Sequence, residues 1–317
     1  MTYLLLVIGF ALLIKGADWF VDGASSIAKI LRISPLLIGL TIVAFGTSSP
    51  EATVSILAAL DGSAEVALGN VIGSSIFNIT LVVGLTALLN PLKVESETIR
   101  KEIPFTLLGS AVLLVLISDI ALQGFSENLL TRSDGLIFLL IFTVFMYYIF
   151  EVARNNRDKI PVEETSEKAT WGKNTFRTII GLAAIIFGGE LVVRNSTEIA
   201  VSLGMSETLV GLTIVAIGTS LPELVTSIMA AIKKQSEIAL GNIVGSNIFN
   251  ILFVLGTSSL ITPLPVNSKI FVDIGLLVIL TVILLVFSRT NFRIGKIEGT
   301  FLAVAYILYL VFIIIRN

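Results

Sequence analysis

The chain of 317 residues contains no cysteine and no histidine. The absence of cysteine excludes disulfides and thiolate metal sites, and the absence of histidine excludes imidazole proton relays and the usual zinc or haem ligation. Charged residues are also scarce, at 14% of the chain. Only oxygen ligands remain for a metal, from carboxylates, amides, hydroxyls and backbone carbonyls. Such ligands suit hard cations such as Ca²⁺, Na⁺, Mg²⁺ or Mn²⁺.

Hydrophobic residues make up 55% of the sequence, and the mean hydropathy of +0.97 is far above that of a soluble protein. Apolar runs long enough to cross a bilayer alternate with short charged turns. The first run is expected to remain as a span and not to be cleaved, because it lacks a basic leader and contains Asp18. The pattern predicts an all-α polytopic membrane protein with ten spans, near 3–28, 35–60, 64–90, 103–119, 134–152, 175–202, 207–232, 236–262, 270–288 and 297–315.

Basic residues are distributed unequally between the two sets of connecting loops. Sixteen Lys and Arg fall in the loops of one side and three in those of the other. Because cytoplasmic loops carry the excess of positive charge, this bias predicts a cell-membrane protein with both termini outside.

The sequence contains a long internal repeat at an offset of 172 residues. Residues 39–60, GLTIVAFGTSSPEATVSILAAL, match residues 211–232, GLTIVAIGTSLPELVTSIMAAI, at 15 of 22 positions. A second match joins residues 65–85 to residues 237–257. We therefore divide the chain into a five-span half over 1–152, a cytoplasmic linker over 153–172 and a second five-span half over 173–317. An odd number of spans inverts the second half, as in alternating-access transporters.

Each copy of the repeat places a proline and a glutamate in the middle of an apolar span, as Pro50-Glu51 and Pro222-Glu223. Mid-helix proline removes a backbone donor, and an unpaired glutamate at membrane depth costs several kcal/mol. Spans 2 and 7 are therefore predicted to be broken at the midplane. The freed carbonyls would lie on one helical face with the glutamate and with the preceding Thr-Ser pairs, which are Thr47, Ser48, Thr219 and Ser220. A packing kink capped by its own hydroxyls is the alternative, but it does not explain two glutamates.

The third span of each half carries a polar stripe at intervals of four residues, formed by Asn70, Ser74 and Asn78 and by Asn242, Ser246 and Asn250. Glycines in small-xxx-small spacing lie beside each stripe and allow close helix contact. For Asn70 and Asn242 an alternative remains open, in which the amides only hydrogen-bond to neighbouring helices. The other four side chains are expected to face the glutamates.

The motifs GTSSPE and GTSLPE, together with GNVIGSSIFN and GNIVGSNIFN, closely resemble the two repeats of prokaryotic sodium/calcium exchangers of the cation/calcium antiporter superfamily. The resemblance covers essentially the whole chain. It implies that Ca²⁺ and Na⁺ share Glu51 and Glu223 as central ligands. It also implies ligand roles for Thr47, Thr219, Ser48, Ser220, Ser74 and Ser246, and for the carbonyls of Ala44 and Ala216. Asn78 and Asn250 complete the predicted set.

Asn250 departs from part of the family, because potassium-dependent exchangers have an aspartate at this position. The asparagine argues against potassium dependence and leaves two formal negative charges at the site. In the first span of each half, Asp18 and Glu190 occupy equivalent positions. They are expected to pair with a neighbouring helix or to lie at the interface, with a place on the ion pathway as the alternative.

The function expected from these features is antiport of Na⁺ against Ca²⁺ by alternating access, electrogenic and independent of K⁺. A Ca²⁺/H⁺ antiporter is the alternative, and a cation channel is a third hypothesis from a different class. An enzyme is disfavoured, because the sequence shows no pair of a nucleophile and a base. The expected surroundings are the lipid bilayer and the transported ions, with no tightly bound cofactor, no nucleic acid and no implied protein partner.

Overall fold

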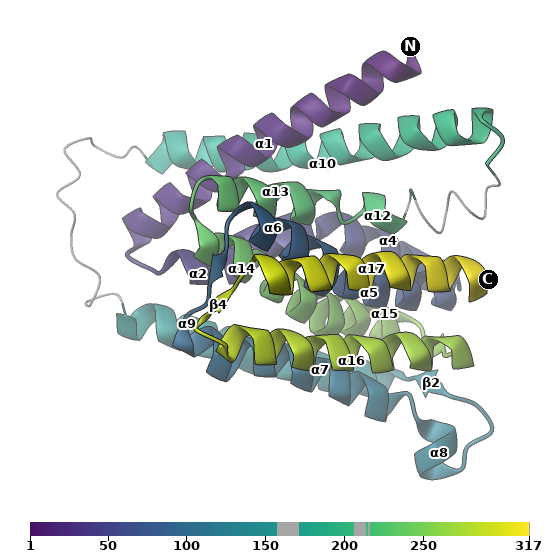
Figure 1. Ribbon diagram of the computed structural model, residues 1–317. Coiled ribbons are helices and arrows are strands. Elements are labelled where there is room, and N and C mark those ends of the chain that lie inside the picture. Colours follow the sequence, from purple (N-terminus) through teal and green to yellow (C-terminus); the bar gives the residue numbers. More distant parts are fainter. Residues whose placement is uncertain (157–170, 206–213, 215, 317) are drawn as a thin grey trace.

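The computed structural model describes residues 1–156, 171–205, 214 and 216–316. The chain is almost entirely helical, and its helices run roughly parallel to one another across the molecule (Figure 1). The long helices are α1 (Thr2–Leu31), α9 (Arg132–Asn156), α10 (Trp171–Ser202), α16 (Ser268–Arg289) and α17 (Lys296–Arg316). The shorter ones are α2 (Pro35–Ile38), α3 (Ala44–Thr47), α4 (Ser49–Leu60), α5 (Ala64–Phe77), α6 (Val83–Leu89), α7 (Ile103–Leu116), α8 (Asp119–Gln123), α12 (Ala216–Gly218), α13 (Leu221–Ile232), α14 (Ser236–Ile248) and α15 (Leu255–Ile261).

Within the described ranges, seven helices are long and apolar enough to cross a membrane, or eight if the bent pair from Pro35 to Leu60 counts as one span. The prediction of a polytopic helical membrane protein is therefore confirmed. The fourth expected span corresponds to α7, which has 14 residues and continues the π-helical turn η3 (Thr98–Glu102). Of the seventh expected span, the structure describes α12 and α13, and residues 206–213 and 215 lie outside the described part.

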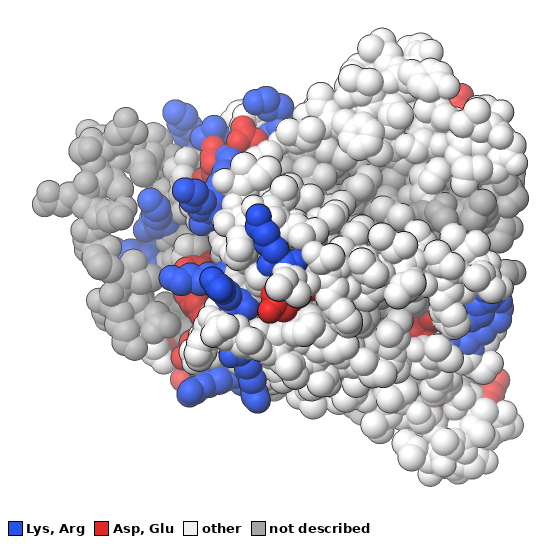
Figure 2. All heavy atoms as spheres, viewed as in Figure 1, with Lys and Arg blue, Asp and Glu red and all other residues white. Residues whose placement is uncertain are grey.

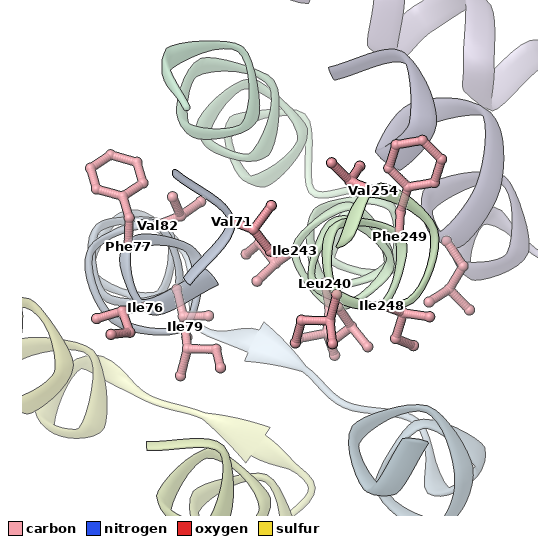
Figure 3. Close-up of a cluster of buried hydrophobic side chains, with 14 of the residues drawn as sticks. Val71, Ile76, Phe77, Ile79, Val82, Leu240, Ile243, Ile248, Phe249 and Val254 are labelled. Carbon is pink, nitrogen blue, oxygen red and sulfur yellow. The ribbon is translucent and has the colours of Figure 1, made fainter. Parts of the chain in front are cut away.

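Two interrupted helices form the centre of the molecule. One joins α5 to α6 through the π-helical turn η2 (Asn78–Val82), and the other joins α14 to α15 through η5 (Phe249–Val254). In the most apolar 18-residue stretch of each, 78% and 94% of the residues are buried, whereas in the other long helices fewer than half are. Val71 and Ile243 point toward each other between these two helices (Figure 3). The apolar core therefore lies on the same two segments that carry the polar stripes.

Helices α1 and α10 form a separate layer along one face of the molecule (Figure 1). Glycines bring the two backbones together, because a Cβ on Gly16 would lie 2.8 Å from the carbonyl oxygen of Gly181. One on Gly188 would lie 2.8 Å from the carbonyl oxygen of Gly9. No side chain fits in these spaces, so the two helices interlock as a pair.

Two short strand pairs mark opposite ends of the molecule. Strand β1 (Leu92–Lys93) pairs with β4 (Arg293–Ile294), and β2 (Leu129–Leu130) pairs with β3 (Leu264–Pro265). We call these the β1–β4 end and the β2–β3 end. Lys and Arg side chains gather at the β1–β4 end, and both termini lie toward the β2–β3 end (Figures 1 and 2). The strands were not expected from the sequence.

Candidate cation-binding site

The Pro50-Glu51 motif lies where one span divides into two helices. α3 ends at Thr47, α4 begins at Ser49, and the two parts of the span are bent by 49°. Pro50 lies in the first turn of α4, where the missing N–H has no intrahelical partner to lose. Glu51 follows in the same turn, where the positive end of the helix dipole favours a carboxylate. The predicted break is therefore present, as a new helix start.

The second half repeats this local geometry. Pro222 and Glu223 lie in the first turn of α13, and the residue before the helix, Ser220, has φ −92° and ψ 7°. The equivalent Ser48 has φ −83° and ψ 6°. The two carboxylates are thus presented by identical helix starts, one from each half of the chain.

The two halves exchange hydrogen bonds at the glutamates. Ser48 donates from Oγ to Oε1 of Glu223 over 2.7 Å, and Ser220 donates from Oγ to Oε1 of Glu51 over 2.9 Å. All four side chains are fully buried. Because each serine crosses to the carboxylate of the other half, the two broken helices form one site.

Asn70 and Asn242 connect the broken helices to the central ones. Asn242 donates to the backbone oxygen of Glu223 and to Ser227, and it accepts a 2.9 Å hydrogen bond from Thr47 of the other half. Asn70 makes the equivalent three contacts with the backbone oxygen of Glu51, with Ser55 and with Thr219. Both amides are fully engaged with neighbouring helices, which agrees with the alternative interpretation of these residues. Sequence reasoning missed Ser55 and Ser227.

Asn78 is oriented by a residue that the sequence analysis did not single out. Asn247 donates from Nδ2 to the backbone oxygen of Ser75, which can only accept. Its Oδ1 must then face Asn78, whose Nδ2 donates to it over 3.1 Å. The Oδ1 of Asn78 therefore has no hydrogen-bond partner among the described residues. The sequence offered one signal for Asn247, which is a difference between the repeats, because the equivalent position 75 is serine.

Asn250 is oriented in a similar way from the other side. Ser74 donates its hydroxyl to the backbone oxygen of Val71 over 3.0 Å, so its oxygen is free to accept. Asn250 donates to it from Nδ2 over 3.3 Å. This contact joins the two central helices and fixes the orientation of the Asn250 amide, whose Oδ1 has no hydrogen-bond partner among the described residues.

A set of buried oxygen atoms has no hydrogen-bond partner among the described residues. Buried oxygens are almost always paired in proteins, so such a group at membrane depth requires water, a proton or a cation. Within the predicted ligand set these atoms are Oε2 of Glu51, Oε2 of Glu223, Oδ1 of Asn78, Oδ1 of Asn250 and Oγ of Ser246. Their chemistry is that of a hard-cation site.

The remaining predicted ligands lie beside this group. Thr47 is fully buried and Thr219 is partly buried. The carbonyl of Ala44 accepts from the backbone N–H of Ser48 over 3.0 Å, so one of its two lone pairs is already engaged. Ala216 begins α12, and its side chain lies outside the described part. Across the described ranges, no third acidic residue forms a metal-binding cluster with the glutamates.

Asp18 and Glu190, which occupy equivalent positions in the repeat, have different surroundings. Asp18 forms a 2.6 Å ion pair with Lys233, at the end of α13. Glu190 instead lines a cavity of about 540 Å³ together with Gly189, Arg194 and Pro222. The expectation of a structural partner thus holds for Asp18.

A helical membrane protein in which two halves each contribute a buried carboxylate to one oxygen-lined centre is organised as a cation transporter. The chain matches the family model described as sodium/calcium exchanger protein over residues 1–151 and 173–315. It therefore belongs to the sodium/calcium exchanger family, which is a family of cation and calcium antiporters and not of enzymes.

Similar proteins cover almost the full length of the chain. It is 34% identical to the sodium/calcium exchanger MaX1 of Methanosarcina acetivorans, over 98% of this chain and 97% of that protein. It is 42% identical to the putative antiporter CaxA of Alkalimonas amylolytica, over 96% and 95% of the two chains. The structure of the sodium-calcium exchanger NCX_Mj soaked with 10 mM Na⁺ and zero Ca²⁺ superposes with a TM-score of 0.84 at 32% identity, covering 98% of this chain and 99% of that one.

Proposed function

We propose that this protein exchanges Na⁺ for Ca²⁺ across the cell membrane by alternating access, without K⁺ and with net movement of charge. The observation that carries the proposal is the pair of buried glutamates, each hydrogen-bonded to a serine of the opposite half and each left with one unpartnered oxygen. Two carboxylates neutralise one Ca²⁺. The same two carboxylates with three Na⁺ retain one positive charge, which makes exchange sensitive to voltage.

The proposed ligands are the twelve residues predicted from the sequence. Support for this set comes from the orphaned oxygens of Glu51, Glu223, Asn78, Asn250 and Ser246. The hydroxyl groups of Ser48 and Ser220 are within hydrogen-bond distance of the carboxylates, so their oxygens lie beside the carboxylate oxygens.

The proposed architecture is ten spans arranged as two inverted repeats of five, joined by the linker over 153–172, with both termini outside. Equivalent helix starts at Ser49 and Leu221 support the duplication. Basic side chains gather at the end opposite the termini (Figure 2), which supports an internal β1–β4 end.

A Ca²⁺/H⁺ antiporter is the second candidate, favoured by the same pair of carboxylates, because two protons replace one Ca²⁺ without net charge. The choice is tested by Ca²⁺ uptake into proteoliposomes at fixed pH, with Na⁺ trapped inside and Na⁺-free medium outside. Uptake that follows the Na⁺ gradient supports the proposal. Uptake that ignores Na⁺ but follows an imposed pH gradient would replace it with proton exchange, and Ca²⁺ flux without any counter-ion would indicate a channel.

A further inference from the structure

Among the described residues, the ion pairs that join the layer formed by α1 and α10 to the rest of the protein lie at one end. At the β1–β4 end, Lys233 lies 2.6 Å from Asp18 and 2.5 Å from Asp22, both on α1. Arg177 of α10 reaches Asp22 over 3.3 Å. Lys233 directly follows α13 as its C-terminal cap residue, and the first turn of the same helix carries Glu223. This cluster therefore joins the outer layer to a helix that forms the site.

Two of these charges have counterparts of opposite sign in the repeat, whereas Asp18 corresponds to Glu190 and keeps its sign. At the offset of 172 residues, Asp22 corresponds to Arg194 and Lys233 corresponds to Asp61. The backbone positions agree as well. Asp61 caps the C-terminus of α4 with φ −80° and ψ 1°, and Lys233 caps that of α13 with φ −78° and ψ 5°. The Asp22–Lys233 pair at one end thus has charge-reversed counterparts, Arg194 and Asp61, in the other half.

Asp61 lies at an electrostatically unfavourable position, which an ion pair with Arg194 would offset. A negative charge at the C-terminus of a helix opposes the helix dipole, whereas Lys233 at the equivalent place is favoured by it. Asp61 is exposed and belongs to no ion pair among the described residues. Arg194 is exposed as well.

The two ends also differ in how closely the α1–α10 layer packs against the helices that carry the site glutamates. α1 packs against α13 at the β1–β4 end, where Thr226 is fully buried. At the β2–β3 end the 540 Å³ cavity separates α10 from α4, with Arg194 and Val54 in its lining. Val54, the counterpart of Thr226, is 37% exposed. A pocket of about 470 Å³ also lies beside Asp22 and Lys233, but its lining contains no residue of the two Pro-Glu motifs. The 540 Å³ cavity is lined by Pro50, Thr219 and Pro222, so the β2–β3 end is open toward the site and the β1–β4 end is closed toward it.

We propose that Asp18, Asp22 and Lys233 act as positioning residues that hold the β1–β4 end closed, and that Asp61 and Arg194 form the matching ion pair when the β2–β3 end closes. The interlocked glycines let α1 and α10 move as one body, so breaking one set of pairs accompanies formation of the other. The proposal rests on the proposed alternating access and does not depend on whether Na⁺ or H⁺ is the counter-ion.

Single thiols test this directly, because the chain has no cysteine. Val54→Cys reports on the β2–β3 end and Thr226→Cys on the β1–β4 end, each three residues after a site glutamate. Labelling by a small soluble maleimide is measured in choline buffer without Na⁺ or Ca²⁺. Lys233→Gln is expected to raise labelling at position 226 relative to position 54 about five-fold, and Arg194→Gln to change the ratio in the opposite direction, as expected for partly exposed ion pairs. Lys234→Gln is the matched control.

A cross-link tests the second pair independently. Asp61→Cys combined with Arg194→Cys is expected to form a disulfide under mild oxidation, faster when Lys233→Gln is also present, whereas Asp61→Cys with Glu198→Cys, one turn further along α10, is expected to react more slowly. Unchanged labelling ratios together with no Asp61–Arg194 cross-link would overturn the proposal. Because neither readout uses Na⁺ or Ca²⁺, a failure of Na⁺/Ca²⁺ exchange in the proteoliposome assay leaves this result separately interpretable.

Discussion

Glu51 and Glu223 each supply one of the two negative charges in the proposed Ca²⁺ site. Glu51→Gln or Glu223→Gln keeps the shape of the side chain and the helix start but removes half of the neutralising charge. We expect Ca²⁺ flux to fall at least about 100-fold, because an unneutralised divalent charge at membrane depth costs several kcal/mol. Flux into proteoliposomes is the measurement, with Glu127→Gln in an exposed loop as control. Near-wild-type flux in either variant would eliminate the two-carboxylate site.

Asn250 sets the number of charges at the site. Asn250→Asp replaces one unpartnered amide oxygen with a carboxylate and adds a third acid. We expect Ca²⁺ transport to become more sensitive to protons and its competition with Na⁺ to change, because the extra carboxylate attracts every cation. Flux is measured against pH, Na⁺ and K⁺, with Asn291→Asp at an exposed loop as control. A variant that only folds poorly, with unaltered ion dependence, would show that Asn250 is structural.

Asn247 provides a test of orientation separate from charge. Asn247→Ala removes the amide that fixes Asn78, so the Oδ1 of Asn78 no longer has one preferred direction. Loss of a buried hydrogen-bond partner costs the folded protein about 1–3 kcal/mol. Where about 1.4 kcal/mol of that is lost from Ca²⁺ binding, the KM for Ca²⁺ rises about 10-fold. Ser75→Ala is the matched control, because the backbone oxygen that accepts from Asn247 remains. Equal KM values in the two variants would contradict the orienting role.

At the scale of elements, the contact between α1 and α10 depends on glycine. A Cβ at Gly16 would meet the backbone of α10 at 2.8 Å, whereas one at Gly275 in α16 has open space around it. Gly16→Leu is therefore expected to separate the pair and destabilise the protein by about 1–3 kcal/mol, with loss of transport. Thermal unfolding in detergent and flux are measured beside Gly275→Leu. Equal effects of the two substitutions would refute the interlocked contact.

The broken helices show how far sequence reasoning reached. Pro50 and Pro222 predicted an interruption in each span, because an interior proline is costly. The structure relieves that cost by starting a new helix, so that each glutamate lies in a first turn. The cross-half bonds at the glutamates join residues 175 and 169 positions apart, and no local pattern specifies such partners. The short strands were missed for the same reason.

At the scale of the whole molecule, the duplication accounts for most of what the sequence predicted. The repeated motifs identified both glutamates and the polar stripes, because each half displays the same costly residues at the same positions. The repeat does not determine which end is open, since that depends on where the α1–α10 layer lies. Charge-reversed counterparts such as Asp22 and Arg194 become informative only when the two ends are compared in space.

The central proposal is that a site with two carboxylates exchanges Na⁺ for Ca²⁺ with net movement of charge, as an exchange of three Na⁺ for one Ca²⁺ would give. It is tested most directly by the voltage at which net Ca²⁺ flux stops in proteoliposomes with fixed Na⁺ and Ca²⁺ gradients and no K⁺. The account predicts a reversal voltage equal to three times the Na⁺ equilibrium potential minus twice the Ca²⁺ equilibrium potential, unchanged by a pH gradient. Flux that is indifferent to voltage, or a reversal that follows the pH gradient instead of the Na⁺ gradient, would contradict it.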